Sequence, residues 1–118
     1  MPGDRIIVYQ KPTCTTCRQV MAILREGGID YEAIDYFIDP IPLPKLRDLV
    51  RELGLPVRAL VRTKERAYRD LDPGRPGVSD EELLAALVDR PELLQRPILE
   101  RGGRAVLARP AERARDIL

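Results

Sequence analysis

Residues 6–18, IIVYQKPTCTTCR, place Cys14 and Cys17, the only two cysteines of the chain, between an apolar run and a helix-like segment at residues 18–26. The sulfur pair is therefore expected at a helix N-terminus, where unpaired backbone N–H groups and the helix dipole favour an anion. A thiolate is such an anion. A neighbouring cation such as Arg18 is expected to lower the thiol pKa from its usual value of about 8.5.

The segments on either side of the cysteines predict a strand, a helix and a second strand. Residues 5–9 are rich in β-branched side chains, and Gly27-Gly28 is typical of a helix end. Residues 31–36 alternate between apolar and polar side chains, which predicts another strand. Such a βαβ unit is expected to have parallel strands and a right-handed crossover.

The middle of the chain predicts helices. Residues 39–44 carry three prolines and predict an irregular connection, followed by a helix over residues 45–53. Thr63 is expected to cap a short helix that runs through Tyr68, and residues 72–77 predict a loop. Ser79 and Glu82 have the spacing of a capping box, which predicts a helix over residues 80–89.

The last third predicts a β-hairpin and a terminal helix. Residues 97–100 and 104–107 flank Gly102-Gly103, the residues that a tight hairpin turn favours. Pro110 is expected at the first position of a helix over residues 110–118. The whole order is that of the thioredoxin layout. We predict a single α/β domain over residues 1–118, with a small four-stranded mixed sheet and a helical insertion at about residues 45–92.

Composition narrows the chemistry. There is no histidine, so the commonest general base and metal ligand is missing, and reactions must use sulfur and arginine. The net charge is +1, with 20 basic and 19 acidic residues interspersed, and no apolar run approaches the length of about 20 residues that spans a bilayer. We expect no nucleic acid or membrane partner. Two close cysteines without an apolar leader favour a reducing cytoplasm.

A C-x-x-C motif beside a βαβ unit predicts redox chemistry. Cys14, at the helix start, is the expected nucleophile, and Cys17, one turn later, is the expected resolving thiol. Zinc would need two further ligands that the chain lacks, whereas two incidental buried cysteines remain an alternative. Arg96-Pro97 precedes the predicted hairpin, and either a cis bond that brings this pair to the nucleophile or a trans bond with Arg96 in solvent fits the sequence.

Four blocks of the sequence, in this order and spacing, resemble the ArsC-type arsenate reductase family of thioredoxin-like proteins. They are residues 11–18, 57–62, 94–98 and 106–110.

This resemblance implies a nucleophilic cysteine, Cys14, and three arginines that hold an oxyanion, Arg62, Arg96 and Arg109, with Arg18 adding to the same field. Convergent guanidinium groups suit the tetrahedral arsenate dianion. The resemblance implies no bound cofactor. Glutathione or another thiol is expected as co-substrate, and a protein of the glutaredoxin or thioredoxin type as reductant.

Two positions depart from the family pattern. Gln10 stands where many members have histidine, so activation of Cys14 would depend on the helix and the arginines. Cys17 stands where such reductases often have serine. With its C-x-x-C pair, the chain resembles the Spx-like branch of this family, whose members are redox-switched regulators that bind RNA polymerase. A thiol-disulfide oxidoreductase of glutaredoxin type is a third possibility, and the retained arginines favour the arsenate reductase.

Overall fold

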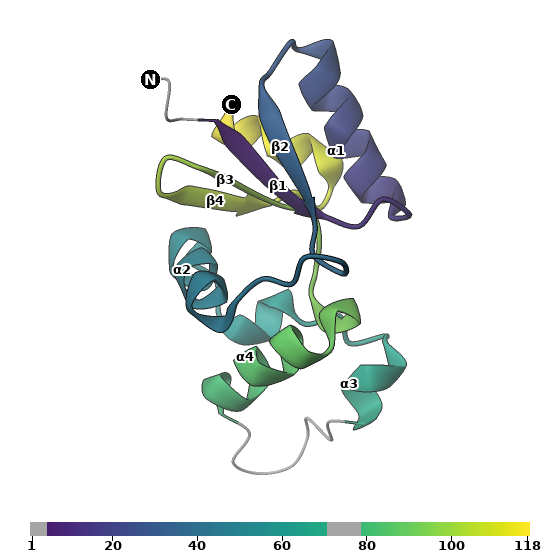
Figure 1. The fold of residues 1–118 in the computed structure, drawn as a ribbon, viewed down its shortest axis with the longest axis vertical. Helices are drawn as coiled ribbons and strands as arrows, with labels where there is room; N and C mark the ends of the chain where they lie inside the picture. The colour runs from purple at the N-terminus through teal and green to yellow at the C-terminus, as the bar shows by residue number, and fades with distance from the viewer. Residues whose placement is uncertain (1–4, 71–78) are drawn as a thin grey trace. The chain divides into compact units, whose positions relative to one another are not determined.

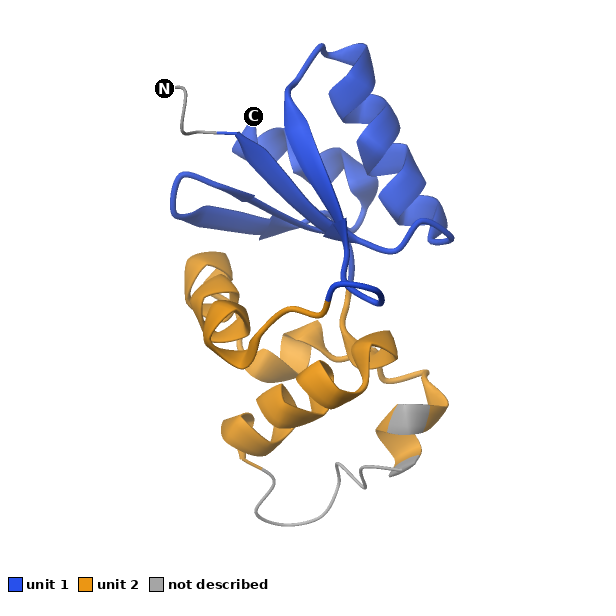
Figure 2. Ribbon diagram, viewed as in Figure 1, with its two compact units in different colours: residues 1–39, 96–118 blue, residues 40–95 orange. Residues whose placement is uncertain are grey.

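The computed structural model describes residues 5–70 and 79–118. The chain divides into two compact units, one of residues 1–39 with 96–118 and one of residues 40–95 (Figure 2). The first unit holds the sheet and the second holds a group of helices. That the chain behaves as one domain with a helical insertion at about residues 45–92 stays a prediction, and each unit is described by itself.

The first unit is built on a four-stranded mixed sheet in the order β2-β1-β3-β4 (Figure 1). Strand β1 (Ile6–Gln10) pairs in parallel with β2 (Tyr31–Asp35) and antiparallel with β3 (Ile98–Arg101), which pairs with β4 (Arg104–Leu107). Helix α1 (Thr15–Glu26) connects the two parallel strands. The predicted βαβ unit and mixed sheet are confirmed, and both parallel strands end at the same edge of the sheet.

The core of this unit lies where α1 and the C-terminal helix η3 (Ala111–Ile117) pack against the sheet and each other. Val20 and Leu24 of α1 are fully buried against Ile6 and Val8 of β1. Burying a side chain of this size stabilises the fold by about 1.5–3 kcal/mol. This packing fixes the end of β1, and hence the start of α1.

The hairpin forms as predicted, because Gly102 and Gly103 have positive φ values of 56° and 78°, which the turn between β3 and β4 requires. The terminal helix differs from the prediction. It is a 3₁₀ helix, and Pro110 precedes it in an extended conformation instead of occupying its first position. Its buried side chains, Ala111, Ala114 and Ile117, recur every three residues, which matches three residues per turn.

The second unit contains α2 (Leu43–Leu53), η1 (Val57–Leu60), α3 (Arg66–Asp70), α4 (Asp80–Asp89) and η2 (Pro91–Leu93). Helix α2 begins two residues earlier than predicted, because Pro44 lies in the first turn, where a missing N–H costs no hydrogen bond. An isolated bridge joins Val61 to Leu94.

The other predictions for this unit had mixed outcomes. Helix α4 has the predicted bounds, and the Ser79 hydroxyl accepts a hydrogen bond from the Glu82 N–H at 3.2 Å. Thr63 does not cap α3, because it lies in a turn closed by the Glu65 N–H on the Arg62 carbonyl, and the helix begins at Arg66. The loop predicted at residues 72–77 lies outside the described residues.

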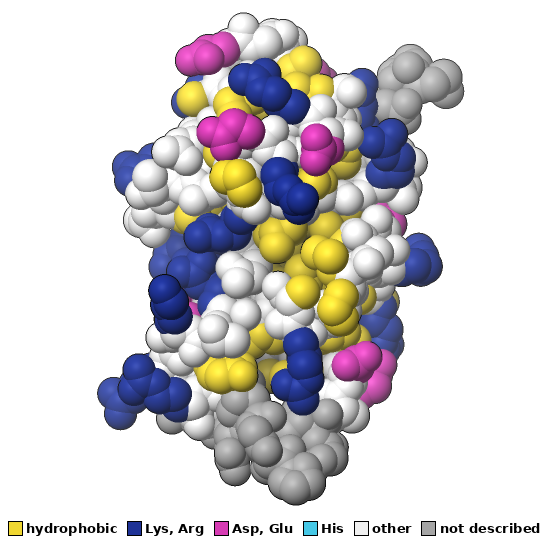
Figure 3. Space-filling model, turned by 180° about the vertical axis from the view of Figure 1, so that it is seen from behind, with side chains coloured by type: hydrophobic (Ala, Val, Ile, Leu, Met, Phe, Trp, Pro, Cys, Tyr) yellow, Lys and Arg dark blue, Asp and Glu magenta, His cyan; other side chains and the backbone are white. Residues whose placement is uncertain are grey.

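Basic side chains are spread over the face drawn in Figure 3, with acidic side chains among them. Over residues 5–70 and 79–118, no helix combines the length and the apolar character needed to cross a membrane.

Candidate active site

Cys14 is the N-cap of α1. Its backbone is extended, with φ −80° and ψ 125°, and its N–H donates to the Lys11 carbonyl at 3.0 Å, which closes the loop between β1 and α1. The Cys14 Sγ accepts the backbone N–H of Cys17 at 3.4 Å. A sulfur thus takes the place that a Ser or Asp oxygen usually has at this position. The predicted location of the pair at the helix start is confirmed.

The pKa of the Cys14 thiol is lowered. Burial raises this pKa, but hydrogen bonds from the backbone N–H and thiol of Cys17, and the hydrogen bond and positive charge of Arg96, together outweigh it. Each of these interactions favours the thiolate over the neutral thiol. Cys14 is also partly exposed. It therefore combines the two properties of a reactive cysteine, a stabilised anion and access from solvent.

Cys17 has the opposite environment. Its side chain is 0% exposed, and burial, with the negative charge of Cys14, raises its pKa to about 12. Both cysteines are free thiols, and Cys17 remains protonated at neutral pH. The pair is thus asymmetric, with a lowered pKa at Cys14 and a raised pKa at Cys17.

Arg96 reaches Cys14 from the segment before β3. The Arg96-Pro97 peptide is cis, Pro97 is fully buried, and Arg96 is 7% exposed. Of the two arrangements that fit the sequence, the structure therefore has the one in which Arg96 leaves solvent and hydrogen-bonds the nucleophilic sulfur. A buried guanidinium needs several partners, and its charge acts strongly where water is excluded.

The other predicted arginines have different surroundings. Arg109 donates from Nη1 to the Arg96 carbonyl at 2.9 Å, so it contacts the main chain of the residue that contacts Cys14. Arg18 is exposed, and its backbone N–H donates to the Cys14 carbonyl at 3.0 Å. Arg62 belongs to the unit of residues 40–95, where its Nε lies 3.3 Å from Glu65 Oε1. Oxyanion binding by these three residues stays a prediction.

Two aromatic residues beside Arg96 were missed by the sequence analysis. Tyr36 accepts a hydrogen bond from Arg96 Nη1 at 3.4 Å, and the Phe37 ring lies 5.6 Å from the guanidinium carbon. The sequence carried only part of the signal, the expected parallel pairing, because the strand predicted over residues 31–36 included Tyr36. Tyr36 and Phe37 directly follow β2, and because β1 and β2 are parallel, residues that follow these strands meet at the same edge of the sheet.

Gln10 ends β1 and is 4% exposed. Among the described residues its Oε1 has no hydrogen-bond partner. The same part of the chain brings together no group of three His, Cys, Asp or Glu side chains that could hold a metal ion.

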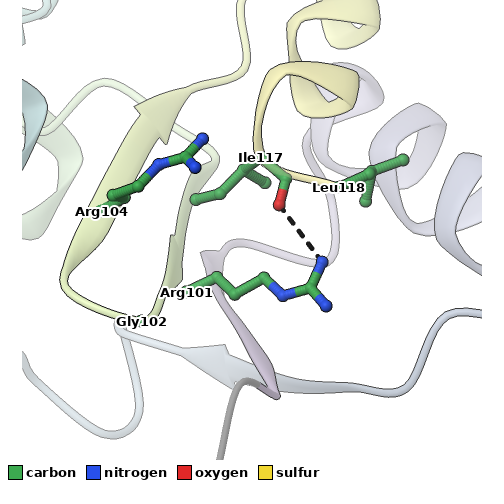
Figure 4. A pocket seen from close by; sticks show the side chains of 5 residues that line it. All are labelled: Arg101, Gly102, Arg104, Ile117 and Leu118. Carbon is green, nitrogen blue, oxygen red and sulfur yellow. Dashed lines mark hydrogen bonds between the residues drawn. The ribbon is translucent and has the colours of Figure 1, made fainter. Parts of the chain in front are cut away.

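A second group of arginines lies at the hairpin of the same unit, around a cavity of about 330 Å³ (Figure 4). Arg101 Nη1 donates to the Ile117 carbonyl at 3.4 Å, and Arg104 Nη2 donates to the Asp116 carbonyl at 3.0 Å. These two guanidinium groups bind the end of η3. None of the predicted site residues lines this cavity.

Comparison with known proteins shows a likeness over nearly the whole chain. The model of the ArsC family matches residues 9–117. The chain is 35% identical over 115 residues to the uncharacterized protein YfgD of Escherichia coli, covering 97% of each chain. It is 34% identical over 114 residues to an arsenate reductase of Neisseria meningitidis serogroup A, covering 96% of this chain and 97% of that one.

A solved structure agrees with these sequences. The arsenate reductase from Vibrio cholerae superposes with a TM-score of 0.93 at 35% identity, covering 98% of this chain and 99% of that one. The predicted α/β, thioredoxin-like fold is thereby confirmed. The match extends over the segments that carry Cys14, Arg96 and Arg109, and the chain belongs to the ArsC family.

Proposed function

We propose that this protein is a thiol-dependent arsenate reductase in which Cys14 is the nucleophile. One observation carries the proposal. The Cys14 sulfur is partly exposed, caps α1, and has a pKa lowered by Cys17 and Arg96. Family membership and the arsenate reductases among the relatives support arsenate as the substrate.

In the first step, the Cys14 thiolate attacks the arsenic atom of arsenate. A sulfur–arsenic bond forms, and the hydroxyl group of the arsenate dianion takes up one proton from solvent and leaves as water. Arsenic remains As(V). Arg96, which acts on the Cys14 sulfur, would offer a guanidinium to the oxyanion, and its charge would offset the negative charge that develops there. Arg109, and by resemblance Arg62 and Arg18, complete the proposed set of cations.

In the second step, a thiol attacks the Cys14 sulfur. A disulfide forms, the sulfur–arsenic bond breaks with its electron pair remaining on arsenic, and arsenite leaves as As(III). Two thiols are oxidised while arsenic gains two electrons. The attacking thiol is either glutathione, which leaves a mixed disulfide for a glutaredoxin-type reductant, or Cys17, which leaves an internal disulfide for a thioredoxin-type reductant. No bound cofactor takes part. We place this thiol chemistry in the cytoplasm, where thiols are kept reduced.

The raised pKa of Cys17 disfavours it as the resolving thiol. Its pKa of about 12 leaves almost no thiolate at neutral pH, but part of that increase comes from the negative charge of Cys14. When Cys14 is bonded to arsenic that charge is gone, and Cys17 becomes easier to deprotonate. Mass spectrometry of protein quenched during turnover distinguishes the two routes. An internal Cys14–Cys17 disulfide supports Cys17, and a glutathione adduct on Cys14 with free Cys17 supports the external thiol.

The experiment for the function is thiol-dependent arsenate reduction by purified protein, measured as arsenite release. Donors are glutathione with glutaredoxin and, separately, thioredoxin with its reductase. Wild-type protein is expected to reduce arsenate with at least one donor, and Cys14→Ser with none. Arg113 is an exposed residue of η3, so the control Arg113→Ala should react at the wild-type rate. Absence of arsenite release with every donor would reject the proposal.

One observation favours a second candidate, a redox switch or a general thiol-disulfide oxidoreductase. The two cysteines are in hydrogen-bond contact, with Cys17 N 3.4 Å from Cys14 Sγ, and a switch needs such a pair. Reduction of a mixed-disulfide substrate without arsenate turnover would identify the oxidoreductase. Retention of RNA polymerase on the oxidised but not the reduced protein would identify an Spx-like regulator.

A further inference from the structure

The turn after β2 brings two adjacent aromatic residues to the edge of the sheet at which β1 also ends. The Tyr36 N–H donates to the Gln10 carbonyl at 3.4 Å, so this turn follows directly from the pairing of β1 with β2. The Phe37 N–H donates to Asp35 Oδ1 at 3.0 Å, and the Asp39 N–H donates to the Asp35 carbonyl at 2.8 Å. An aspartate that bonds its own turn in this way holds the following residues in place.

Tyr36 is 2% exposed, and its hydroxyl accepts a hydrogen bond from Arg96 Nη1 at 3.4 Å. The same guanidinium hydrogen-bonds the Cys14 sulfur. A guanidinium is planar, so a bond at one nitrogen fixes the direction of the others. The Tyr36 hydroxyl therefore restricts the orientations in which Arg96 can meet the Cys14 sulfur.

Phe37 provides a second constraint. Its ring centroid is 5.6 Å from the Arg96 guanidinium carbon and 4.3 Å from Lys11 Nζ, and it lies 5.3 Å from the Tyr36 ring, tilted by 41°. Both cations are within the range of about 6 Å at which a ring attracts a cation. One ring thus holds two positive side chains, Lys11 from the loop that carries Cys14 and Arg96 from the segment before β3.

We propose that Tyr36 and Phe37 are positioning residues of the active site, which orient Arg96 toward the nucleophilic sulfur of Cys14. The proposal concerns the reactivity of the thiol and rests on the proposed function only in its consequence for arsenate turnover. Tyr36 fixes the direction of the Arg96 guanidinium. Phe37 attracts the Arg96 guanidinium, and the same ring attracts Lys11 of the β1–α1 loop.

The groups that determine the charge of Cys14 are few. Cys17 of α1 and Arg96 hydrogen-bond the sulfur. Tyr36 and Phe37 of the β2 turn contact Arg96, and Lys11 of the β1–α1 loop contacts Phe37. If Arg96 loses its orientation, the sulfur keeps the Cys17 N–H but loses part of the bond and charge from the guanidinium. The thiolate then forms only at higher pH, while the fold is unchanged.

The test is the pH dependence of alkylation of Cys14 by iodoacetamide, which needs no arsenate. Cys17 is buried with a raised pKa, so the reagent modifies Cys14 first, and tandem mass spectrometry verifies the position of the alkyl group. Tyr36→Phe removes only the hydroxyl, and Phe37→Leu removes only the ring. For each, the midpoint of the rate profile is expected to rise by about one pH unit, a tenfold loss of thiolate below the midpoint.

Two controls separate positioning from general structural damage. Tyr31→Phe removes a hydroxyl from β2 on a half-buried residue outside this cluster, and Phe37→Tyr keeps the aromatic ring. Both are expected to keep the wild-type midpoint. If Tyr36→Phe and Phe37→Leu also keep it, the positioning role is rejected, whatever the arsenate activity. If Phe37→Tyr shifts as far as Phe37→Leu, the ring is not what holds the cations, and the role of Phe37 is rejected.

Arsenate turnover then distinguishes the two proposals. Where the midpoint shifts and wild-type protein reduces arsenate, kcat/KM of Tyr36→Phe should fall in proportion to the lost thiolate and recover when the pH is raised. If the midpoint shifts but wild-type protein shows no arsenate turnover, the positioning role holds and the proposed function fails. If turnover falls without any shift of the midpoint, the positioning role as stated is wrong.

Discussion

Arg96 and the two hairpin arginines, Arg101 and Arg104, lie in the same unit of the protein but bind different kinds of acceptor. Arg96 is almost fully buried and hydrogen-bonds the Cys14 sulfur and the Tyr36 hydroxyl. Arg101 and Arg104, at the β3–β4 hairpin, donate to main-chain carbonyls of η3. In a chain with 17 arginines, the residue type alone says little. Burial and the chemical nature of the acceptor identify the arginine that belongs to a reactive site.

The largest difference is expected between the arsenate kcat/KM of two alanine variants, one at Arg96 and one at Arg101. Arg96→Ala should reduce arsenate kcat/KM by about 100-fold, because a charge-assisted hydrogen bond to the reacting sulfur and a donor to the oxyanion are lost together. Arg101→Ala should stay within about twofold of wild type, since its partner is the Ile117 carbonyl. The measurement is steady-state arsenite release at pH 7. Equal losses in both variants would contradict the distinction.

A conservative exchange separates the charge of Arg96 from its shape. Arg96→Lys keeps a positive charge but cannot bond Tyr36 and Cys14 through a rigid planar group. Its kcat/KM is expected at about one tenth of wild type, above that of Arg96→Ala. Full activity of Arg96→Lys would show that charge alone is sufficient. The matched exchange Arg101→Lys should have no effect on turnover.

The raised pKa of Cys17 should make the free energy of unfolding depend on pH. An unfolded cysteine ionises near pH 8.5, whereas Cys17 in the folded protein ionises at about 12. Between these values the unfolded state binds fewer protons than the folded one. Stability from the protonated Cys17 is therefore complete below about pH 8.5 and is lost as the pH rises, at up to about 1.4 kcal/mol per pH unit.

Urea denaturation of wild-type protein and Cys17→Ala at pH 8 to 10.5 measures this contribution. The difference between the two slopes reports the titration of Cys17, together with the change in the Cys14 pKa that follows when the Cys17 thiol hydrogen bond is lost. Wild-type stability should fall more steeply than that of Cys17→Ala. Parallel slopes would mean that Cys17 is not held protonated, and would remove the asymmetry on which Cys14 activation depends.

The smallest expected effects concern the hairpin arginines. Arg104→Ala removes one hydrogen bond from an exposed side chain to the Asp116 carbonyl, so unfolding free energy should fall by about 0.5–1 kcal/mol. The double variant Arg101→Ala/Arg104→Ala should lose at most about twice that amount and keep the wild-type alkylation profile of Cys14. A changed profile would place the hairpin arginines in the reactive site.

Strands, helix caps and turns that depend on a few neighbouring residues could be predicted from the sequence. The apolar run, the C-x-x-C pair, Gly102-Gly103 and Ser79 each specify a strand, a cap or a turn within a few residues, and these elements are present. The predicted hairpin singled out the Arg96-Pro97 pair with two possible arrangements, and the resemblance gave Arg96 a role in oxyanion binding. The burial of Arg96 beside Cys14 depends on contacts across about 80 residues of chain.

The errors arose where tertiary packing decides. Helix η3 winds as a 3₁₀ helix because its apolar residues at a spacing of three meet the core, although Pro110 had predicted an ordinary helix start. Tyr36 resembled one more residue of a strand. Its role follows from the register that pairs Gln10 with Asp35, which brings the turn after β2 to the loop with Cys14, and register is not visible in either segment alone.

The cap of α1 has a consequence for how chemistry at Cys14 can be observed. The Cys17 N–H lies in the first helical turn and donates to the sulfur that reacts. When that sulfur becomes part of an adduct or a disulfide, it loses the negative charge that makes it a strong acceptor. The first turn of α1 then loses stability with each covalent step and regains it on reduction. Amide exchange at Cys17 is therefore a natural reporter of the chemical state of the nucleophile.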